Sequence, residues 1–381
     1  MTHNPNKPSA EQNLLSDILG GAGKPKVKLT PEVEQEIREH LAEAQARAER
    51  GEPMTQEMKE FMENVRLWVG MPENVRNIFP SIESILKEKP DAERGYISLQ
   101  QWLDLLHMAE AKKEKNWKRW IEEIFRFPGG GKIAVGKHLD LGFCAELTHL
   151  PKGLEVGGGL NLWGCTSLTH LPEGLKVRGN LKLSFCGGLA ALPESLEVGE
   201  HLILDHCKRL TTLPNGLNIG KGLDLGYCTG LTNLPEGLRV KTDLGLFGCT
   251  GLTSLPEKLE VKGSLKLNCC TGLTELPEKL KVGEGLNLTD CTGLTELPKG
   301  LEVGGELWLN GCTGLIRLTE GLKVKYNLHL VDCKKLTELP KDLEVGGHLF
   351  LSKYSHEKVK KDAERLKRER KIKGDVEYWN T

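Results

Sequence analysis

The sequence predicts an α+β fold in which a gently curved solenoid of stacked, short parallel β-strands, without outer helices, follows an α-helical N-terminal domain. Three observations lead to this fold class. A 21-residue repeat runs ten times from Leu147 to His356 with no insertion or deletion, and a fixed period of this length is the signature of stacked coils. Every copy holds a Leu-x-Leu pair, whose period of two is typical of a strand. Nearly every copy also holds a Leu-Pro pair, which disfavours a helix there because proline lacks an N–H.

Each repeat divides into two extended stretches and a tight return. The copy from Leu294 to Gly314 reads Leu-Thr-Glu-Leu-Pro-Lys-Gly-Leu-Glu-Val-Gly-Gly-Glu-Leu-Trp-Leu-Asn-Gly-Cys-Thr-Gly. We expect the Leu-x-Leu runs from Leu139 to Leu351 to form eleven strands of one parallel sheet, with their leucines inward. The Leu-x-Val run predicts a second extended stretch, and the glycines after Val predict the return turn.

The cysteines follow the same period. The chain has eleven, and Cys269 alone lies outside the ladder. A coil spacing of about 4.8 Å would allow neighbouring cysteines to pair, but their identical environments favour buried, free thiols at the turn after each strand. The ladder consists of Cys144, Cys165, Cys186, Cys207, Cys228, Cys249, Cys270, Cys291, Cys312 and Cys333.

Four segments are expected along the chain. Residues 1–28 are polar and aperiodic, which predicts a disordered arm. Residues 29–128 carry helical apolar stripes behind capping residues such as Thr30 and Thr55, which predicts a helical domain that caps the solenoid. Residues 129–356 hold a partial coil and the ten repeats. Residues 357–381 are expected to form a capping helix and, from the repeat-like pattern around Val376, a final strand.

The repeat resembles that of the leucine-rich repeat family. Its Leu-x-Leu-x-x-Cys-x-x-Leu run is similar to the family's strand-and-turn motif, with Cys where many members carry Asn, and the Leu-Pro-x-x-Leu continuation is similar to the short bacterial repeats. The resemblance covers about residues 129–378. It implies a curved solenoid whose strand face binds a partner, usually a protein.

Composition and charge exclude several functions. The formal net charge is −1, which gives no general case for a nucleic-acid or membrane partner. We find neither a signal peptide nor an apolar run long enough to span a membrane, so the cytoplasm is the expected compartment, with secretion by a signal-less route left open. Residues 357–373, with nine Lys or Arg against four Asp or Glu, are the only candidate nucleic-acid patch, and a solvated capping helix is the simpler interpretation.

No catalytic residue, metal site or cofactor is predicted, and we expect the protein not to be an enzyme. Residues Gly131 to Lys137 fit a phosphate-loop spacing, but the segment is an ordinary part of the repeat and no helix is expected after it. His149 and His170 stack in adjacent coils without a third ligand. No small-molecule substrate is evident.

The variable positions beside the strand leucines form the candidate binding surface. They include aromatic side chains that have no folding reason to face outward, interspersed with Asp, Asn and His, as on protein-recognition surfaces. A protein-binding scaffold or adaptor is therefore the predicted function. The alternatives are a carbohydrate-binding module that uses the aromatic rings, a bacterial effector-type protein, and a structural spacer. The candidate residues on the concave strand face are Asp140, Trp163, Phe185, His201, Ile203, Asp205, Asp224, Tyr227, Asp243, Phe247, Lys266, Asn287, Trp308, His329 and Phe350.

Overall fold

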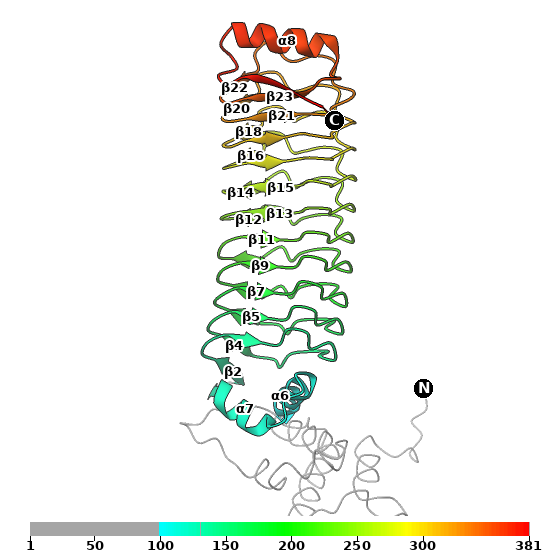
Figure 1. The fold of residues 1–381 in the computed structure, drawn as a ribbon. Helices are drawn as coiled ribbons and strands as arrows, with labels where there is room; N and C mark the ends of the chain where they lie inside the picture. The colour runs from blue at the N-terminus through cyan, green and yellow to red at the C-terminus, as the bar shows by residue number, and fades with distance from the viewer. Residues whose placement is uncertain (1–98, 130, 381) are drawn as a thin grey trace, which may run out of the picture. The chain divides into compact units, whose positions relative to one another are not determined.

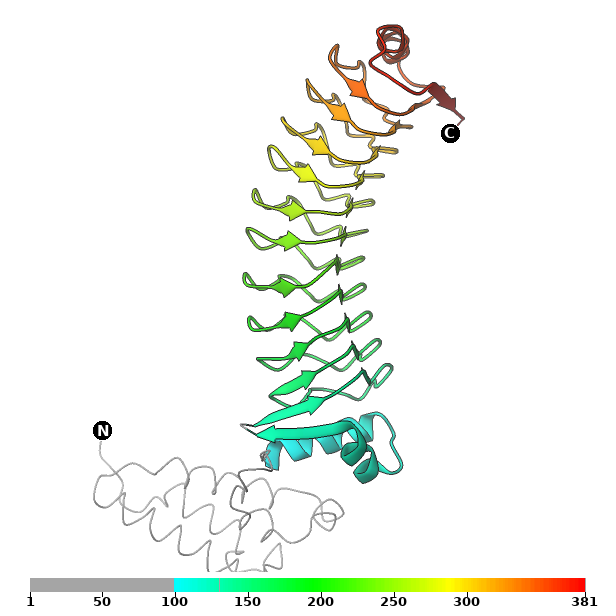
Figure 2. The same ribbon diagram turned by 90° about the vertical axis from the view of Figure 1, so that its left-hand side faces the viewer.

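The coils form a stack of parallel strands in the computed structural model, which describes residues 99–129 and 131–380. Asp104–Pro128 and Lys132–Thr381 belong to one compact unit. The predicted arm at 1–28 and the predicted helices that begin at Thr30 and Thr55 lie outside the described residues. Within the unit, the coils rise one above the other in sequence order (Figure 1). The predicted β-solenoid is confirmed, and Figure 2 shows that its stack bends only gently.

The Leu-x-Leu runs form the first sheet. It has twelve strands in strict chain order, all parallel along the repeats. Equivalent residues of adjacent coils stand side by side, so Leu223 pairs with both Leu202 and Leu244. The predicted eleven strands and the closing strand are thus confirmed. They are β3 (Leu139–Asp140), β5 (Leu160–Asn161), β7 (Leu181–Lys182), β9 (Leu202–Ile203), β11 (Leu223–Asp224), β13 (Leu244–Gly245), β15 (Leu265–Lys266), β17 (Leu286–Asn287), β19 (Leu307–Trp308), β21 (Leu328–Leu330), β23 (Leu349–Ser352) and β24 (Val376–Trp379).

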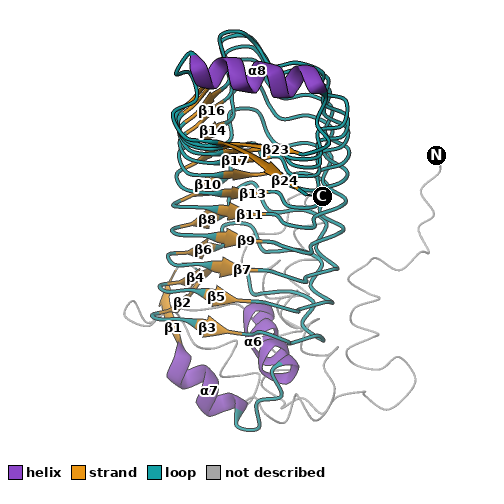
Figure 3. Cartoon of the chain, turned by 45° about the horizontal axis from the view of Figure 1, so that its top comes forward, coloured by secondary structure: helices purple, strands orange, loops and turns teal. Residues whose placement is uncertain are grey.

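The Leu-x-Val runs form a second layer that is divided into two sheets of six strands (Figure 3). The first comprises β1 (Phe125–Gly129), β2 (Lys132–Val135), β4 (Leu154–Val156), β6 (Lys176–Val177), β8 (Glu197–Val198) and β10 (Asn218–Ile219). The second comprises β12 (Arg239–Val240), β14 (Glu260–Val261), β16 (Lys281–Val282), β18 (Glu302–Val303), β20 (Lys323–Val324) and β22 (Glu344–Val345).

The division of this layer coincides with a local change in hydrogen bonding. In regular coils the residue after Val donates its N–H to the Val or Ile carbonyl of the preceding coil, as Gly220 does to Val198. Lys241 donates instead to Lys221, 3.2 Å away. Thr242 follows it, and its hydroxyl is buried without a hydrogen-bond partner among the described residues. The pairing between β10 and β12 is interrupted at this shifted turn.

Glycine at the return turn permits the close stacking of coils. A Cβ added to Gly220 would lie 1.7 Å from the carbonyl oxygen of Gly199, and one added to Gly304 would lie 2.1 Å from that of Gly283. Both distances are far inside van der Waals contact. In these coils the approach of the neighbouring backbone thus requires the glycine that the repeat predicted at the return.

The core is a continuous column of leucine, valine and cysteine. The leucine pairs of β3 to β23 are at most 2% exposed. Each buried aliphatic side chain contributes about 1.5–3 kcal/mol of gross stabilisation, and because that surface is buried only against the next coil, coils stabilise one another. The ladder is confirmed: the cysteines are free, and each from Cys165 to Cys333 donates its S–H to a leucine carbonyl of the preceding coil, as Cys249 does to Leu225 at 3.1 Å.

Both ends of the stack are covered. At the C-terminal end, α8 (Glu357–Arg368) buries Val359, Ala363 and Leu366 against the last coil. At the other end, α6 (Leu99–Ala111) and α7 (Trp117–Ile124) precede β1. Lys112 at the end of α6 donates a 2.6 Å hydrogen bond to the Asp140 carbonyl. The last part of the range predicted as helical, residues 125–128, belongs instead to the strand β1 (Phe125–Gly129).

Candidate functional site

Polar side chains on the strand face support the stack. The residue before the first strand leucine accepts the backbone N–H of the equivalent residue in the next coil. His201 Nδ1 accepts from Gly222 at 3.3 Å, and Asp243 Oδ1 accepts from Ser264 at 2.9 Å. These two predicted binding residues thus have a structural role between coils.

A second row of polar side chains lies where the strands lead into the following turn. The residue between the two leucines, where it is Asp or Asn, accepts the N–H two positions ahead, as in an Asx turn. Asp140, Asp224 and Asn287 do so at 2.9–3.0 Å, each within its own coil. Lys266 forms a 3.1 Å ion pair with Asp243. Four acidic or amide candidates, one histidine and one lysine are therefore engaged with neighbours on the face.

Aromatic rings on the same face form a continuous line. We call this line the aromatic stripe: one ring per coil over six consecutive coils, each in contact with the next. Successive ring centroids are 4.2, 5.8, 4.3, 4.5 and 4.6 Å apart. The exposed fraction is 69% for Phe143, 37% for Trp163, 43% for Phe185 and 40% for Tyr227. In chain order the stripe consists of Phe143, Trp163, Phe185, His206, Tyr227 and Phe247.

Four of the six ring-bearing residues have a left-handed backbone conformation. Each residue before a ladder cysteine has a positive φ, between 56° and 72°. Three coils place glycine there, but Phe143, Phe185, His206 and Tyr227 occupy the position in others. Bulky residues are uncommon in this left-handed region, because their Cβ approaches the following carbonyl. The exposed rings are therefore held in place despite a local conformational cost.

The remaining two rings belong to residues one position earlier in the repeat, where the residue that follows is glycine. Gly164 and Gly248 hold the left-handed position after Trp163 and Phe247. A Cβ on Gly248 would lie 2.9 Å from the Tyr227 ring, and one on Gly164 would lie 3.2 Å from the Phe143 ring. The rings of neighbouring coils can thus lean over these glycines and meet Trp163 and Phe247 edge to face, at 76° and 84°.

Polar and apolar neighbours flank the middle of the stripe. Asp205 accepts a hydrogen bond from Ser184, and its other oxygen lies 3.1 Å from Nδ1 of His206. The Asp205 carboxylate thus stands between the Ser184 hydroxyl and the His206 imidazole. Ile203 lies between Lys182 and Asp224 on β9, half-buried.

A second, smaller aromatic group lies at the C-terminal end of the face. His329 is stacked between Trp308 and Phe350, with centroids 5.7 and 4.4 Å away, and Phe350 contacts Trp379. Burial lowers the pKa of His329, and Glu306, whose carboxylate is 3.6 Å from Nε2, opposes that shift. Trp308, His329 and Phe350 are half-buried, so this group is less open than the aromatic stripe.

The structure therefore divides the fifteen candidates into sets. Trp163, Phe185, Tyr227 and Phe247 come together in the aromatic stripe, and Trp308, His329 and Phe350 form a separate group. Phe143, the most exposed large apolar side chain of the stripe, was not among the candidates. It lies in the partial coil before the first full repeat, but its place before Cys144 matches that of Phe185 before Cys186, and this signal could have identified it.

The described residues were also compared with the requirements of a metal site, a phosphate loop and a membrane span. In the described part of the chain, no three His, Cys, Asp or Glu side chains are grouped to hold a metal ion. Lys132–Val135 is a strand, and the turn after it leads into β3, so no helix follows the Gly131–Lys137 motif. Among the described helices, none has the length and apolar content to cross a membrane.

No family model matches the chain, and no curated protein has a matching sequence.

Proposed function

We propose that the chain is a non-enzymatic scaffold of the leucine-rich repeat type that binds a protein partner along its aromatic stripe. The stripe itself carries the proposal, because its exposed rings lie in contact across six coils. Rings on an outward face add little to the core, and four of them occupy backbone positions that favour glycine. Aromatic side chains are enriched at the energetic centres of protein interfaces.

The scaffold suits such a partner in shape and rigidity. Five coil spacings of about 4.8 Å give the stripe a length of about 24 Å, which is within the span of an ordinary interface. Its rings lie in the turns directly after strands whose leucines are fully buried, so little freedom is lost when a partner binds. The polar residues beside it, which already support the stack, would form the rim.

A comparison of stripe and non-stripe variants tests the proposal. The double variant Phe185→Gly/Tyr227→Gly removes two central rings while keeping the residue that other coils use at that position. The control, Ile316→Gly/Tyr326→Gly, removes two side chains that are 51% and 52% exposed elsewhere. A partner first captured from lysate and then purified should bind the stripe variant at least about thirtyfold more weakly, the effect of one interface hot spot of ~2 kcal/mol. It should bind the control as tightly as the unchanged chain.

The same variants separate the alternatives. If the stripe variant still binds the partner, the interface lies elsewhere on the chain. Binding to a glycan array that is lost in the stripe variant, with no protein captured, would instead favour the carbohydrate-binding alternative. If the chain binds neither a protein nor a glycan, the structural-spacer alternative is favoured.

A further inference from the structure

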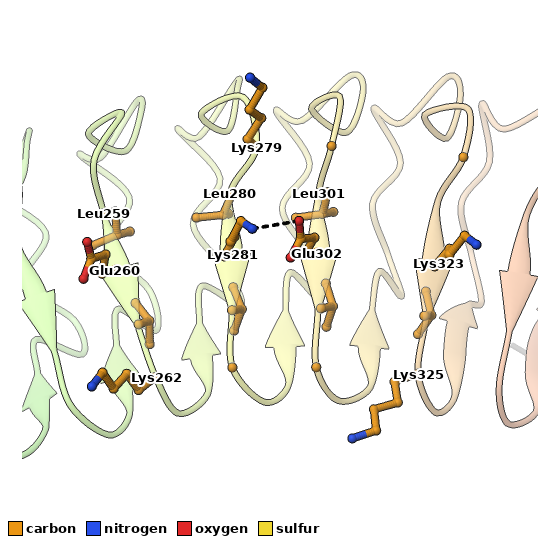
Figure 4. A pocket seen from close by; sticks show the side chains of 18 of the residues that line it. Leu259, Glu260, Lys262, Lys279, Leu280, Lys281, Leu301, Glu302, Lys323 and Lys325 are labelled. Atoms are coloured by element: carbon orange, nitrogen blue, oxygen red, sulfur yellow. Dashed lines mark ion pairs between the residues drawn. The ribbon is translucent and has the colours of Figure 1, made fainter.

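A second surface lies on the outer side of the second layer, away from the aromatic stripe. A groove of about 1450 Å³ runs along the strands β12 to β22 and reaches the segment after α8. Ten Lys or Arg and four Glu line it, a formal charge of +6. Figure 4 shows Lys279 at one end of the strands and Lys262 and Lys325 at the other, with the Lys281–Glu302 ion pair between them. The groove therefore has a floor and two rims.

The floor is electrically balanced. Its outward residues alternate between Glu and Lys from coil to coil, and register brings each beside the next. Lys281 pairs with Glu302 at 2.9 Å, and Lys323 with Glu344 at 3.1 Å. The floor thus satisfies its own charges, and the positive charge belongs to the rims.

The rim lysines are free. Lys258 and Lys279 stand on one rim, and Lys262 and Lys325 on the other; all four are exposed. None of them has a side-chain hydrogen bond or ion pair within the described part of the chain, although the Lys325 ammonium lies 5.5 Å from the Tyr326 ring centroid. Lysines without partners on both sides of a groove have no role in holding the coils together.

The repeat reinforces this point. Of the eleven return turns from Gly136 to Gly346, seven carry glycine, and the other four carry a basic residue: Arg178, Lys241, Lys262 and Lys325. On the opposite rim, Lys279 has a φ of 58°, where Gly237 and Gly300 of nearby coils have 71° and 70°. Lysine therefore replaces the residue that suits the backbone, and every exception at the return turn has the same sign of charge.

We propose that this groove binds an extended acidic segment of a partner protein. An extended chain directs successive side chains to opposite sides, so neighbouring acidic residues would reach both lysine rims. The neutral peptide backbone would lie over the balanced floor. A nucleic-acid strand carries its charge on the backbone, which would lie over Glu260, Glu302 and Glu344, and no aromatic residue lines the groove to stack its bases. The same groove of a second copy would present its own lysine rims, so like charges oppose self-pairing here.

Binding of two anionic probes tests the inference. The full chain is titrated into a fluorescein-labelled dodecaglutamate peptide or into a labelled twelve-nucleotide oligo-dT, in 50 mM salt, and anisotropy is measured. Dodecaglutamate should bind more tightly than oligo-dT and should be released as salt is raised to 500 mM, because exposed charges are screened. Tighter binding of oligo-dT, or no binding of dodecaglutamate, overturns the proposal.

Variants locate the site. Lys258→Gly/Lys262→Gly/Lys279→Gly places the repeat's own glycine at three rim positions and should weaken dodecaglutamate binding about tenfold, as expected for three exposed ion pairs. The matched control is Arg178→Gly, the same turn position four coils from Lys262, which should leave affinity unchanged. The corresponding Lys→Gln triple variant removes the charge and keeps side-chain bulk, and should show the same loss. Unchanged affinity in both triple variants, or an equal loss in the control, contradicts a groove site.

Discussion

At the residue scale, the position before each ladder cysteine links folding to recognition. The backbone there is left-handed in every coil from Phe143 to Asp332, which allows the cysteine to turn into the core. Glycine meets this requirement without strain, as at Gly311. An aromatic residue costs about 1–2 kcal/mol in that conformation, and contacts with adjacent rings offset part of this. The conformational cost that ring contacts do not offset indicates that these aromatic residues serve a property other than stability.

A comparison of two substitutions at Phe185 measures that strain. Phe185→Gly and Phe185→Ala both remove the contacts with Trp163 and His206. Glycine also relieves the left-handed conformation, at φ 61°, whereas alanine does not. We expect the glycine variant to be more stable than the alanine variant by about 1 kcal/mol, measured by urea unfolding followed by circular dichroism. Equal stabilities would mean that the ring is not strained.

The residues of the face differ in how well sequence reasoning anticipates them. An outward aromatic residue needs an explanation, and the repeat alone predicted Trp163 and Tyr227 as candidates. The sequence does not show which group an outward Asp or His will bind, because a hydrogen bond such as that from the Ser264 N–H to Asp243 depends on the spacing between adjacent coils. Sequence reasoning therefore predicted which side chains face outward, and the structure was needed to separate the supporting polar rows from the exposed rings.

At the element scale, in-register stacking imposes a rule on charge. Because equivalent residues of successive coils stand side by side, a repeated lysine or glutamate would form a column of like charges. The outward position of the second layer instead alternates along Glu260, Lys281, Glu302, Lys323 and Glu344. Opposite charges directly across strands stabilise a sheet, and like charges destabilise it.

Reversal of one charge tests this alternation. Glu302→Lys places three lysines in successive coils, removes the 2.9 Å pair with Lys281 and adds two repulsive contacts. We expect a loss of about 1 kcal/mol in the free energy of unfolding at low salt, which 1 M NaCl should largely abolish. Glu278→Lys, an exposed position between Glu257 and Lys299 in the stack, serves as the control and should have little effect. A loss that persists at high salt would point to packing rather than charge.

The elements were predictable where the repeat is regular and less so where it is not. Two alternating leucines and a fixed period determine a strand, its register and its neighbour. The interruption between β10 and β12 lies at the turn of Lys241 and Thr242, and the bond from Lys241 to the Lys221 carbonyl has no sequence signal, because Arg178 and Lys262 at the equivalent position keep the regular bond. Similarly, Phe125 reads as part of an apolar helical stripe, but β1 is formed through pairing with β2, a tertiary effect.

At the scale of the whole stack, the thiol ladder connects the coils through one repeated interaction. Each buried S–H donates to the carbonyl of the preceding coil at 3.0–3.2 Å for cysteines beyond Cys144. Burial raises the pKa of the Cys165, Cys186, Cys207, Cys228, Cys249, Cys270 and Cys312 thiols from an ordinary 9.0 to about 12. The folded coils thus require protonated thiols.

This requirement predicts unfolding in mild alkali. Below pH 9 the thiols are protonated in both states, so they add no pH dependence. Above pH 9 the thiols of the unfolded chain ionise while those of the folded chain stay protonated, so stability falls by about 1.4 kcal/mol per pH unit for each thiol. Seven thiols acting together should unfold the stack between roughly pH 9 and 10.5, well below their folded pKa of about 12.

Circular dichroism and thiolate absorbance near 240 nm, recorded over the same pH titration, check this prediction. The two signals should change together, because the thiols ionise only when the coils open. Replacement of Cys207, Cys228 and Cys249 by serine, whose hydroxyl does not ionise in this range, should make the transition less steep. Thiolate absorbance that appears near pH 9 while the dichroism is unchanged would show that the folded thiols ionise freely, and the ladder would then have no part in alkaline unfolding.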